Sequence, residues 1–174
     1  MPSKIHYIRL VSIIIMVAGL GSSHIQAQSP FNKKEVKANQ VTYTVSDYDN
    51  PNYKSVAVAD KDNKLVKNAK VNTGRLSDIS IQGDKKLNEI FLDVFGKEKL
   101  QEMLPEKRIV LIFYISKDGK VMETAYLISK KTVITPKELE ALEKQLKKYV
   151  SFTFKVEVEE ERNQFYTIVW PVFF

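Results

Sequence analysis

The feature that most constrains the fold is an uninterrupted apolar run followed by a tight-turn signal. Residues 109–115 are seven consecutive apolar or aromatic residues, a pattern typical of a strand that is covered on both faces. Asp118 and Gly119 follow, and residues 121–128 form a second strand-like run. Because an Asp-Gly pair readily adopts the positive φ angles of a type I′ turn, the segment predicts an antiparallel hairpin closed by that turn.

Two coinciding start signals predict a helix after this hairpin. Thr135 and Glu138 have the spacing of a capping box, and Pro136 suits the first helical position. Apolar residues then recur at helical spacing and are expected to line the buried face: Leu139, Leu142, Leu146, Tyr149 and Val150. On the outer, solvated face we expect two i,i+4 ion pairs: Glu140–Lys144 and Glu143–Lys147.

The rest of the chain has the pattern of shorter strands and an interrupted helix. Alternation predicts strands at 41–45, 53–59 and 64–71, with turns at 47–52 and 60–63. Helical periodicity begins near residue 85 with Asp84 as the N-cap, breaks at Gly96 and stops at Pro105. Alternation returns at 152–158 and 164–174. Together these segments predict an α+β fold: an antiparallel sheet with one main packed helix, preceded by a small N-terminal strand region and a helix pair.

The N-terminus has the order of charge, apolar run and small residues that is typical of a secretory signal peptide. Lys4 and Arg9 precede an uncharged, mostly apolar run at 10–20, which is too short for a membrane-spanning helix of about 20 residues. Ala27 offers a cleavage point. We therefore expect a signal peptide at 1–27, a flexible Lys-rich leader at 28–39 and a single domain at 40–174. The protein is then located in the periplasm or secreted from a Gram-negative bacterium, without an integral membrane anchor.

The composition restricts the available chemistry. The sequence has no cysteine and two histidines, and both histidines, His6 and His24, lie in the expected signal peptide. A processed chain would lack the commonest general base and the thiol nucleophile, and it would offer zinc only carboxylate ligands. We therefore expect no enzymatic activity, no cofactor and no metal site. The formal net charge of +6 is spread along the chain, so it does not indicate a nucleic-acid partner.

Two groups of carboxylates have both a functional and a structural interpretation. Asp47, Asp49 and Asn50 could ligate calcium, but the Gly and the distal Glu of a calcium loop are missing. We interpret this group as a turn before Pro51. The glutamates at 157 and 159–161 could bind a cation or a basic partner, and we interpret them as the solvated end of a hairpin.

The block at 108–174 resembles the C-terminal domain of TonB, the periplasmic protein that couples inner-membrane energy to outer-membrane transporters. Residues 110–121 look like its first strand, Asp-Gly turn and second strand, 138–149 like its crossing helix, and 166–174 like its closing strand. In TonB the edge of that last strand pairs with an extended peptide of the transporter. The resemblance therefore implies a binding domain. The uncleaved membrane helix and Pro-rich spacer of TonB have no counterpart here, so energy transduction is not implied.

The last predicted strand carries the candidate binding residues. Its inward face is expected to pack under the helix: Tyr166, Ile168, Trp170, Val172 and Phe174. We predict that Phe165, Val169 and Phe173, on the opposite face, form a partner-binding surface if nothing covers them. Our leading hypothesis is a non-catalytic envelope protein that binds a peptide or protein by strand addition, or pairs with a second copy as a homodimer. The alternative is a small-ligand-binding or inhibitor protein with a pocket between sheet and helices.

Overall fold

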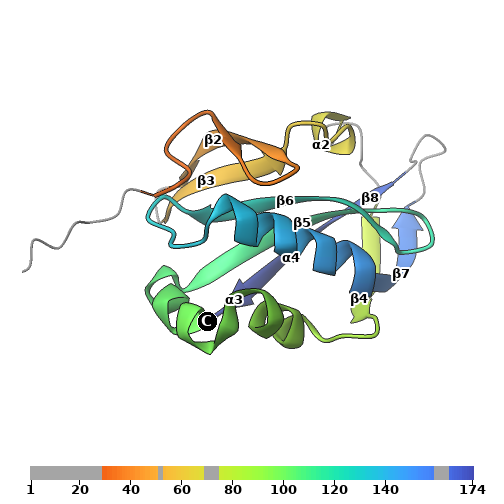
Figure 1. Cartoon of the computed structure of the whole chain (residues 1–174). Helices are drawn as coiled ribbons and strands as arrows, with labels where there is room; N and C mark the ends of the chain where they lie inside the picture. Colours follow the sequence, from red (N-terminus) through yellow and green to blue (C-terminus); the bar gives the residue numbers. More distant parts are fainter. Residues whose placement is uncertain (1–28, 51–52, 69–74, 159–164) are drawn as a thin grey trace, which may run out of the picture.

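The computed structural model, which describes residues 29–50, 53–68, 75–158 and 165–174, consists of an antiparallel sheet with helices packed against it (Figure 1). The main sheet has six strands in the order β1-β2-β3-β6-β5-β8. Their bounds are Glu35–Lys37, Thr42–Asn50, Tyr53–Asp60, Val121–Ser129, Arg108–Ile115 and Tyr166–Phe173. All pairs are antiparallel, and the predicted α+β class is confirmed.

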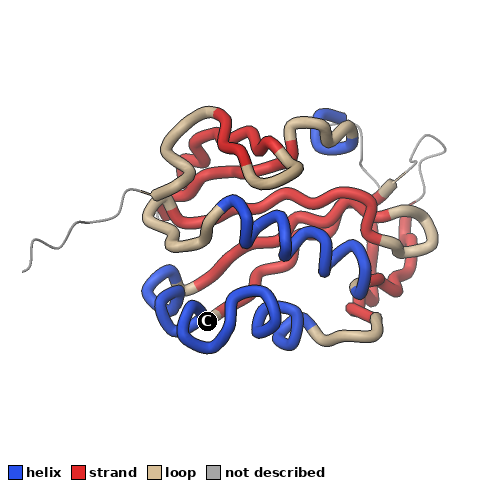
Figure 2. Tube along the Cα trace, in the orientation of Figure 1, coloured by secondary structure: helices blue, strands red, loops and turns tan. Residues whose placement is uncertain are grey.

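The two longer helices lie on the same side of this sheet (Figure 2). Helix α4 (Pro136–Tyr149) crosses the sheet, and α3 (Leu87–Met103) continues into a 3₁₀ turn, η2 (Leu104–Glu106), beside the C-terminus of the chain. A second, two-stranded sheet consists of β4 (Arg75–Gln82) and β7 (Ser151–Val158). The expected signal peptide at 1–27 lies outside the described residues. None of the helices within the described residues has the length and apolar character needed to span a bilayer.

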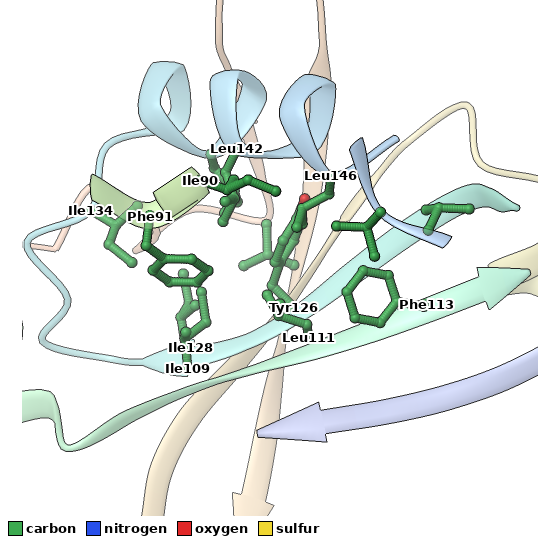
Figure 3. Packing of buried hydrophobic residues seen from close by; sticks show 14 of the residues in the cluster. Ile90, Phe91, Ile109, Leu111, Phe113, Tyr126, Ile128, Ile134, Leu142 and Leu146 are labelled. Atoms are coloured by element: carbon green, nitrogen blue, oxygen red, sulfur yellow. The ribbon is translucent and has the colours of Figure 1, made fainter. Parts of the chain in front are cut away.

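The main core lies between these helices and the inward side chains of β5 and β6. Leu111 and Tyr126 from the sheet and Ile90 and Leu142 from the helices are completely inaccessible to solvent, and Figure 3 shows them converging. Burial of a side chain of this size stabilises the fold by about 1.5–3 kcal/mol. This shared core fixes α3 and α4 against one face of the sheet.

Helix α4 begins as its sequence predicts. The Thr135 hydroxyl accepts from the Glu138 backbone N–H at 3.3 Å, and the Glu138 carboxylate accepts from the Thr135 N–H at 2.7 Å. Pro136 is the first helical residue. The predicted buried leucines, at positions 139, 142 and 146, are completely buried, so the capping box and the apolar stripe are both confirmed.

The predictions of a flexible leader at 28–39 and of a solvated outer face on α4 are wrong for linked reasons. Phe31 is 3% exposed, and β1, which lies within the segment expected to be flexible, pairs with β2. The Glu140 carboxylate accepts from the backbone N–H groups of Asn39 at 2.7 Å and Gln40 at 3.2 Å. Tyr43 donates its hydroxyl to Glu143 at 3.2 Å. Both i,i+4 ion pairs form, but the N-terminal segment covers their two carboxylates.

Two further expectations for the N-terminal half are wrong. The strand expected at 64–71 is replaced over its described part by a single helical turn, α2 (Leu65–Asn68). Its first N–H groups, from Lys64, Leu65 and Val66, donate to the Glu123 carboxylate, a cap that is distant in the sequence. The turn expected at 47–52 starts later, because β2 continues to Asn50. Residues 51–52 and 69–71 lie outside the described residues.

Helix α3 and its surroundings differ in detail from the predicted helix pair. The N-cap is Lys86 in place of Asp84, and Gly96 breaks the helix with φ 71° and ψ 167°, as its position in the sequence predicts. Strand β4 was not predicted. Its pairing with β7 slips twice and Asp78 adopts a positive φ of 49°, so the sequence lacks clean alternation. The strand predicted at 152–158 is β7.

The predicted hairpin is present, with a different turn. Gly119 donates its N–H to the Ser116 carbonyl at 3.0 Å, and among the loop residues 116–120 it alone has a positive φ, of 82°. A type I′ turn needs positive φ at both central residues, so this loop is a type I turn followed by a left-handed glycine. The strand register accordingly shifts between Tyr114 and Ile115.

Candidate binding surface

Strand β8 forms an edge of the main sheet. It pairs with β5 on one side and has no strand partner on its other side among the described residues. The Phe174 N–H donates to the Lys107 carbonyl at 3.2 Å, and the β5–β8 register shows no slip. Because backbone groups alternate in direction along an antiparallel strand, Val169, Pro171 and Phe173 point theirs away from β5. Their N–H and C=O groups face the open edge.

The position of Pro171 follows from this alternation. Its missing N–H falls on the open side, so the ladder between β5 and β8 stays complete, which is the placement in which a strand tolerates proline. At position 171 the open edge therefore offers a carbonyl acceptor but no N–H donor. The donors of Val169 and Phe173 remain on either side of it.

The three predicted binding residues do not form one surface. Val169 and Phe173 are 60% and 68% exposed. Phe165 is only 9% exposed, because it packs on Tyr114 with ring centroids 6.0 Å apart, in a small cluster that Leu65 of α2 also contacts. The segment at 64–71, which the sequence predicted to be a strand, contains the helical turn α2 in its described part. This turn covers the part of the sheet face on which Phe165 lies. Phe165 is therefore corrected to a core residue.

An apolar groove of about 490 Å³ lies between α3 and the open edge of β8. The strand wall comprises Trp170, Pro171, Val172, Phe173 and Phe174, and the helical wall comprises Leu87, Asn88, Phe91, Leu100, Gln101 and Leu104. None of these side chains is ionisable, so the groove offers no acid or base. Asn88 and Gln101 are its polar groups. The shape suits an apolar side chain or ligand held beside an open strand edge.

The sequence raised a pocket between sheet and helices as an alternative, but it did not locate this groove. The periodicity at Leu100, Met103 and Leu104 predicts one buried stripe. In the structure Met103 is completely buried while Leu104 is 54% exposed at the groove. The break at Gly96 and the stop at Pro105 are the signals that the second half of the helix follows a separate course.

The carboxylate alternatives gain no support. Asp47 forms an ion pair with Lys130 at 2.5 Å, and the side chains of Asp49 and Asn50 are not described. The glutamates at 159–161 lie outside the described residues. Among the described residues, no three His, Cys, Asp or Glu side chains are grouped closely enough to hold a metal ion.

Comparisons with known proteins support the fold. No family model and no curated protein matches the sequence. Among solved structures, the chain is similar to a DUF5043 family protein from Bacteroides uniformis ATCC 8492, with a TM-score of 0.55 and 18% sequence identity. The match covers 84% of this chain and 87% of that chain. At this identity the likeness shows the fold alone and assigns no function.

Proposed function

We propose that this chain is a non-catalytic, exported protein of the bacterial envelope that binds an extended segment of a protein partner along β8. One observation carries the proposal: the open edge of β8 from Val169 to Phe173 borders an apolar groove. An edge supplies main-chain hydrogen bonds to an added strand, and neighbouring pockets select its alternate side chains. Both elements of that recognition mode lie side by side here.

The geometry defines the segment that fits best. An added strand can use the N–H and C=O groups of Val169 and Phe173, but it finds only the carbonyl of Pro171. Since Pro171 cannot donate a hydrogen bond to the added strand, affinity depends more on the side chains of the bound segment than it would at an edge without proline. In an added strand, every second side chain would enter the groove beside Trp170 and Leu104. We therefore propose a segment with large apolar residues at alternate positions, each contributing about 1.5–3 kcal/mol when fully buried.

The likeness to the C-terminal domain of TonB remains part of this proposal. The β5–β6 hairpin, the crossing helix α4 and the edge position of β8 agree with the order of elements that the likeness implies. Export rests on the N-terminal sequence pattern. We do not extend the proposal to energy coupling, because the sequence pattern that suggests export is that of a cleaved segment.

The experiment uses the single tryptophan of the chain, Trp170, as a reporter in the groove. Short peptides are selected from a random library on residues 28–174, and binding is followed by Trp170 fluorescence. We expect selected peptides to carry apolar residues at alternate positions. Leu104→Glu should weaken binding at least about tenfold by placing a charge at the groove. Leu92→Glu is the matched control, since Leu92 is 41% exposed on α3, the helix that leads into the turn with Leu104, and does not line the groove.

A second candidate is a small apolar ligand in the same groove, which the polar side chains of Asn88 and Gln101 favour. Peptides that are N-methylated at alternate positions separate the two, because methylation removes strand pairing and keeps the side chains. If methylation leaves affinity unchanged, the groove binds side chains or small ligands without strand addition. If no peptide binds in a Leu104-dependent way, the proposed peptide function is wrong.

A further inference from the structure

The face of the main sheet that is turned away from α3 and α4 carries a row of side chains that spans five strands. Strand pairing places Tyr48 opposite Ser55, Ser55 opposite Ser129, and Arg108 opposite Phe173. Val110 pairs with Leu127, which brings Arg108 beside Ser129 in the same row. With strands about 4.8 Å apart, the row runs about 19 Å from Tyr48 to Phe173. Both aromatic ends are exposed, by 44% and 68%.

The middle of this row is hollowed and apolar at its base. A depression of about 340 Å³ lies over it, with Val110 and Leu127 among its lining residues. Ser55 and Ser129 also line it and contribute hydroxyl groups. Helix α2 covers the sheet farther along, around Tyr114 and Ala125, and does not line this depression.

The charged side chains around the depression are mostly basic. Five of the residues that line it are basic and one is acidic: Lys54, Lys107, Arg108, Lys130 and Lys131, with Glu106. The acidic group is engaged locally, because the Glu106 carboxylate accepts from the Thr132 hydroxyl and the Val133 N–H, each at 2.9 Å. Lys130 pairs with Asp47, which lies opposite the core residue Val56 and therefore on the other face of the sheet, so Lys130 does not add to the charge of this face. The surface thus keeps a local excess of positive charge.

We propose that this face docks on an anionic phospholipid surface, with one lipid phosphate held in the depression. Lysine and arginine side chains and serine hydroxyls are donors that suit phosphate oxygens, and a negative membrane surface attracts a cluster of basic residues. Tyr48 and Phe173, exposed at the two ends of the row, are placed to contact the interfacial layer of the bilayer. An anionic bilayer thus offers a partner for the basic residues, for the serine hydroxyls and for the two exposed aromatic side chains.

An acidic protein segment fits this face less well. Protein interfaces are anchored by large apolar side chains seated in well-packed pockets, whereas the middle of this row consists of Ser55, Ser129 and Arg108, which are all polar. The proposal is independent of the peptide function at the β8 edge, because that function uses the edge and the groove on the helical side. Phe173 borders both surfaces and is left unchanged in the test.

The test measures co-sedimentation of residues 28–174 with vesicles. One set contains phosphatidylglycerol and phosphatidylcholine, and the other contains phosphatidylcholine alone. We expect binding to the first set only, and weaker binding as salt rises. The double variant Arg108→Glu, Lys131→Glu should reduce partitioning at least about tenfold, given the contribution of each basic residue near such a surface.

The matched control is Lys97→Glu, Lys137→Glu, which changes the net charge equally on the exposed surface of α3 and α4. If the control loses binding as strongly as the test variant, net charge and not this face is responsible, and the proposal is overturned. Absence of binding to both vesicle sets overturns it as well. Because the depression would hold one lipid phosphate, millimolar inorganic phosphate at constant ionic strength should compete with the vesicles for the protein. Vesicle binding that is unchanged by inorganic phosphate contradicts the proposed phosphate site.

Discussion

Replacing Glu140 by glutamine tests whether α4 holds the N-terminal segment through a charged side chain. Glu140 is 2% exposed, and its carboxylate accepts from the N–H groups of Asn39 and Gln40 and from the Lys144 ammonium at 2.7 Å. Glutamine has nearly the same shape but carries no charge. Its NH₂ group would meet the ammonium of Lys144, and its carbonyl would remain to accept from the two backbone groups.

The size of the effect follows from these contacts. A hydrogen bond to a charged group contributes about 1.5–3 kcal/mol and one to a neutral group about 1 kcal/mol, so weakening two such bonds loses about 1–4 kcal/mol together. Loss of the ion pair to Lys144, whose side chain is 59% exposed, adds about 0.3–0.5 kcal/mol. We expect the free energy of unfolding at pH 7 to fall by about 2 kcal/mol. For a domain of this size, Tm should fall by about 4–8 °C.

The effect should depend on pH in a defined direction. The Lys144 ammonium, together with the backbone N–H groups of Gln40 and Asn39, lowers the pKa of Glu140 below its usual value of 4.5 against the opposing effect of burial. A group whose pKa is lower in the folded state stabilises the fold above its unfolded pKa, and the stabilisation is lost as pH falls through the folded pKa. The difference between wild type and Glu140→Gln should be constant at pH 6–8 and shrink below about pH 4.5.

Urea denaturation at a series of pH values measures both quantities. Glu98→Gln, on the exposed surface of α3, is the control and should change the free energy of unfolding by less than about 0.5 kcal/mol. A loss below about 0.5 kcal/mol at pH 7 for Glu140→Gln would refute the anchoring role of the carboxylate. A loss that stays constant down to pH 3 would show that packing and not charge is responsible.

Three further predictions concern local structure. Glu123→Gln weakens the cap of α2, so the backbone amides of Leu65 and Val66 should exchange with solvent faster than in wild type in a hydrogen-exchange experiment. Gly119→Ala should lower the free energy of unfolding in urea by at least about 2 kcal/mol, since its Cβ would lie 1.9 Å from the Phe152 carbonyl oxygen at a φ of +82°; a smaller loss contradicts the close approach. Pro171→Val restores a donor on the open edge, and sedimentation should then show concentration-dependent self-association.

The elements that sequence predicts best are those specified by near neighbours. The start of α4 is encoded by Thr135, Pro136 and Glu138, and each acts within one helical turn. The β5–β6 hairpin is likewise encoded by two apolar runs around Gly119. Even there, the turn type depended on whether the residues before the glycine adopt positive φ, which the Asp-Gly pair alone does not determine.

The features that sequence did not predict depend on distant contacts. The burial of Glu140 and Glu143 requires the N-terminal segment, about 100 positions away, to lie over α4. The cap of α2 by Glu123 likewise depends on a residue that is more than 50 positions away in the sequence. A polar segment predicts solvation only where nothing else satisfies its polar groups, and here carboxylates and backbone amides satisfy one another.

The candidate site was predicted only in part, because strand parity is a local property whereas exposure depends on distant contacts. Alternation along 166–173 placed Val169 and Phe173 on one face, and this depends only on strand parity. Exposure is a different property, because it depends on which element covers the face. Phe165 shares that face and is buried, since α2 and Tyr114 lie over its end of the sheet. The groove at β8 depends on the path of α3 after Gly96, which sequence periodicity does not encode.

Pro171 connects the register of β8 to its use as an edge. A shift of one residue against β5 would turn the nitrogen of Pro171 toward the ladder and move Phe173 to the core face. The observed register avoids both costs, so the proline disfavours the alternative pairing. The same residue removes one donor from the open edge, and a blunted edge is less prone to pair with any chain it meets. A partner that adds to β8 must therefore gain its affinity from the groove, which makes recognition depend on side chains and not on backbone alone.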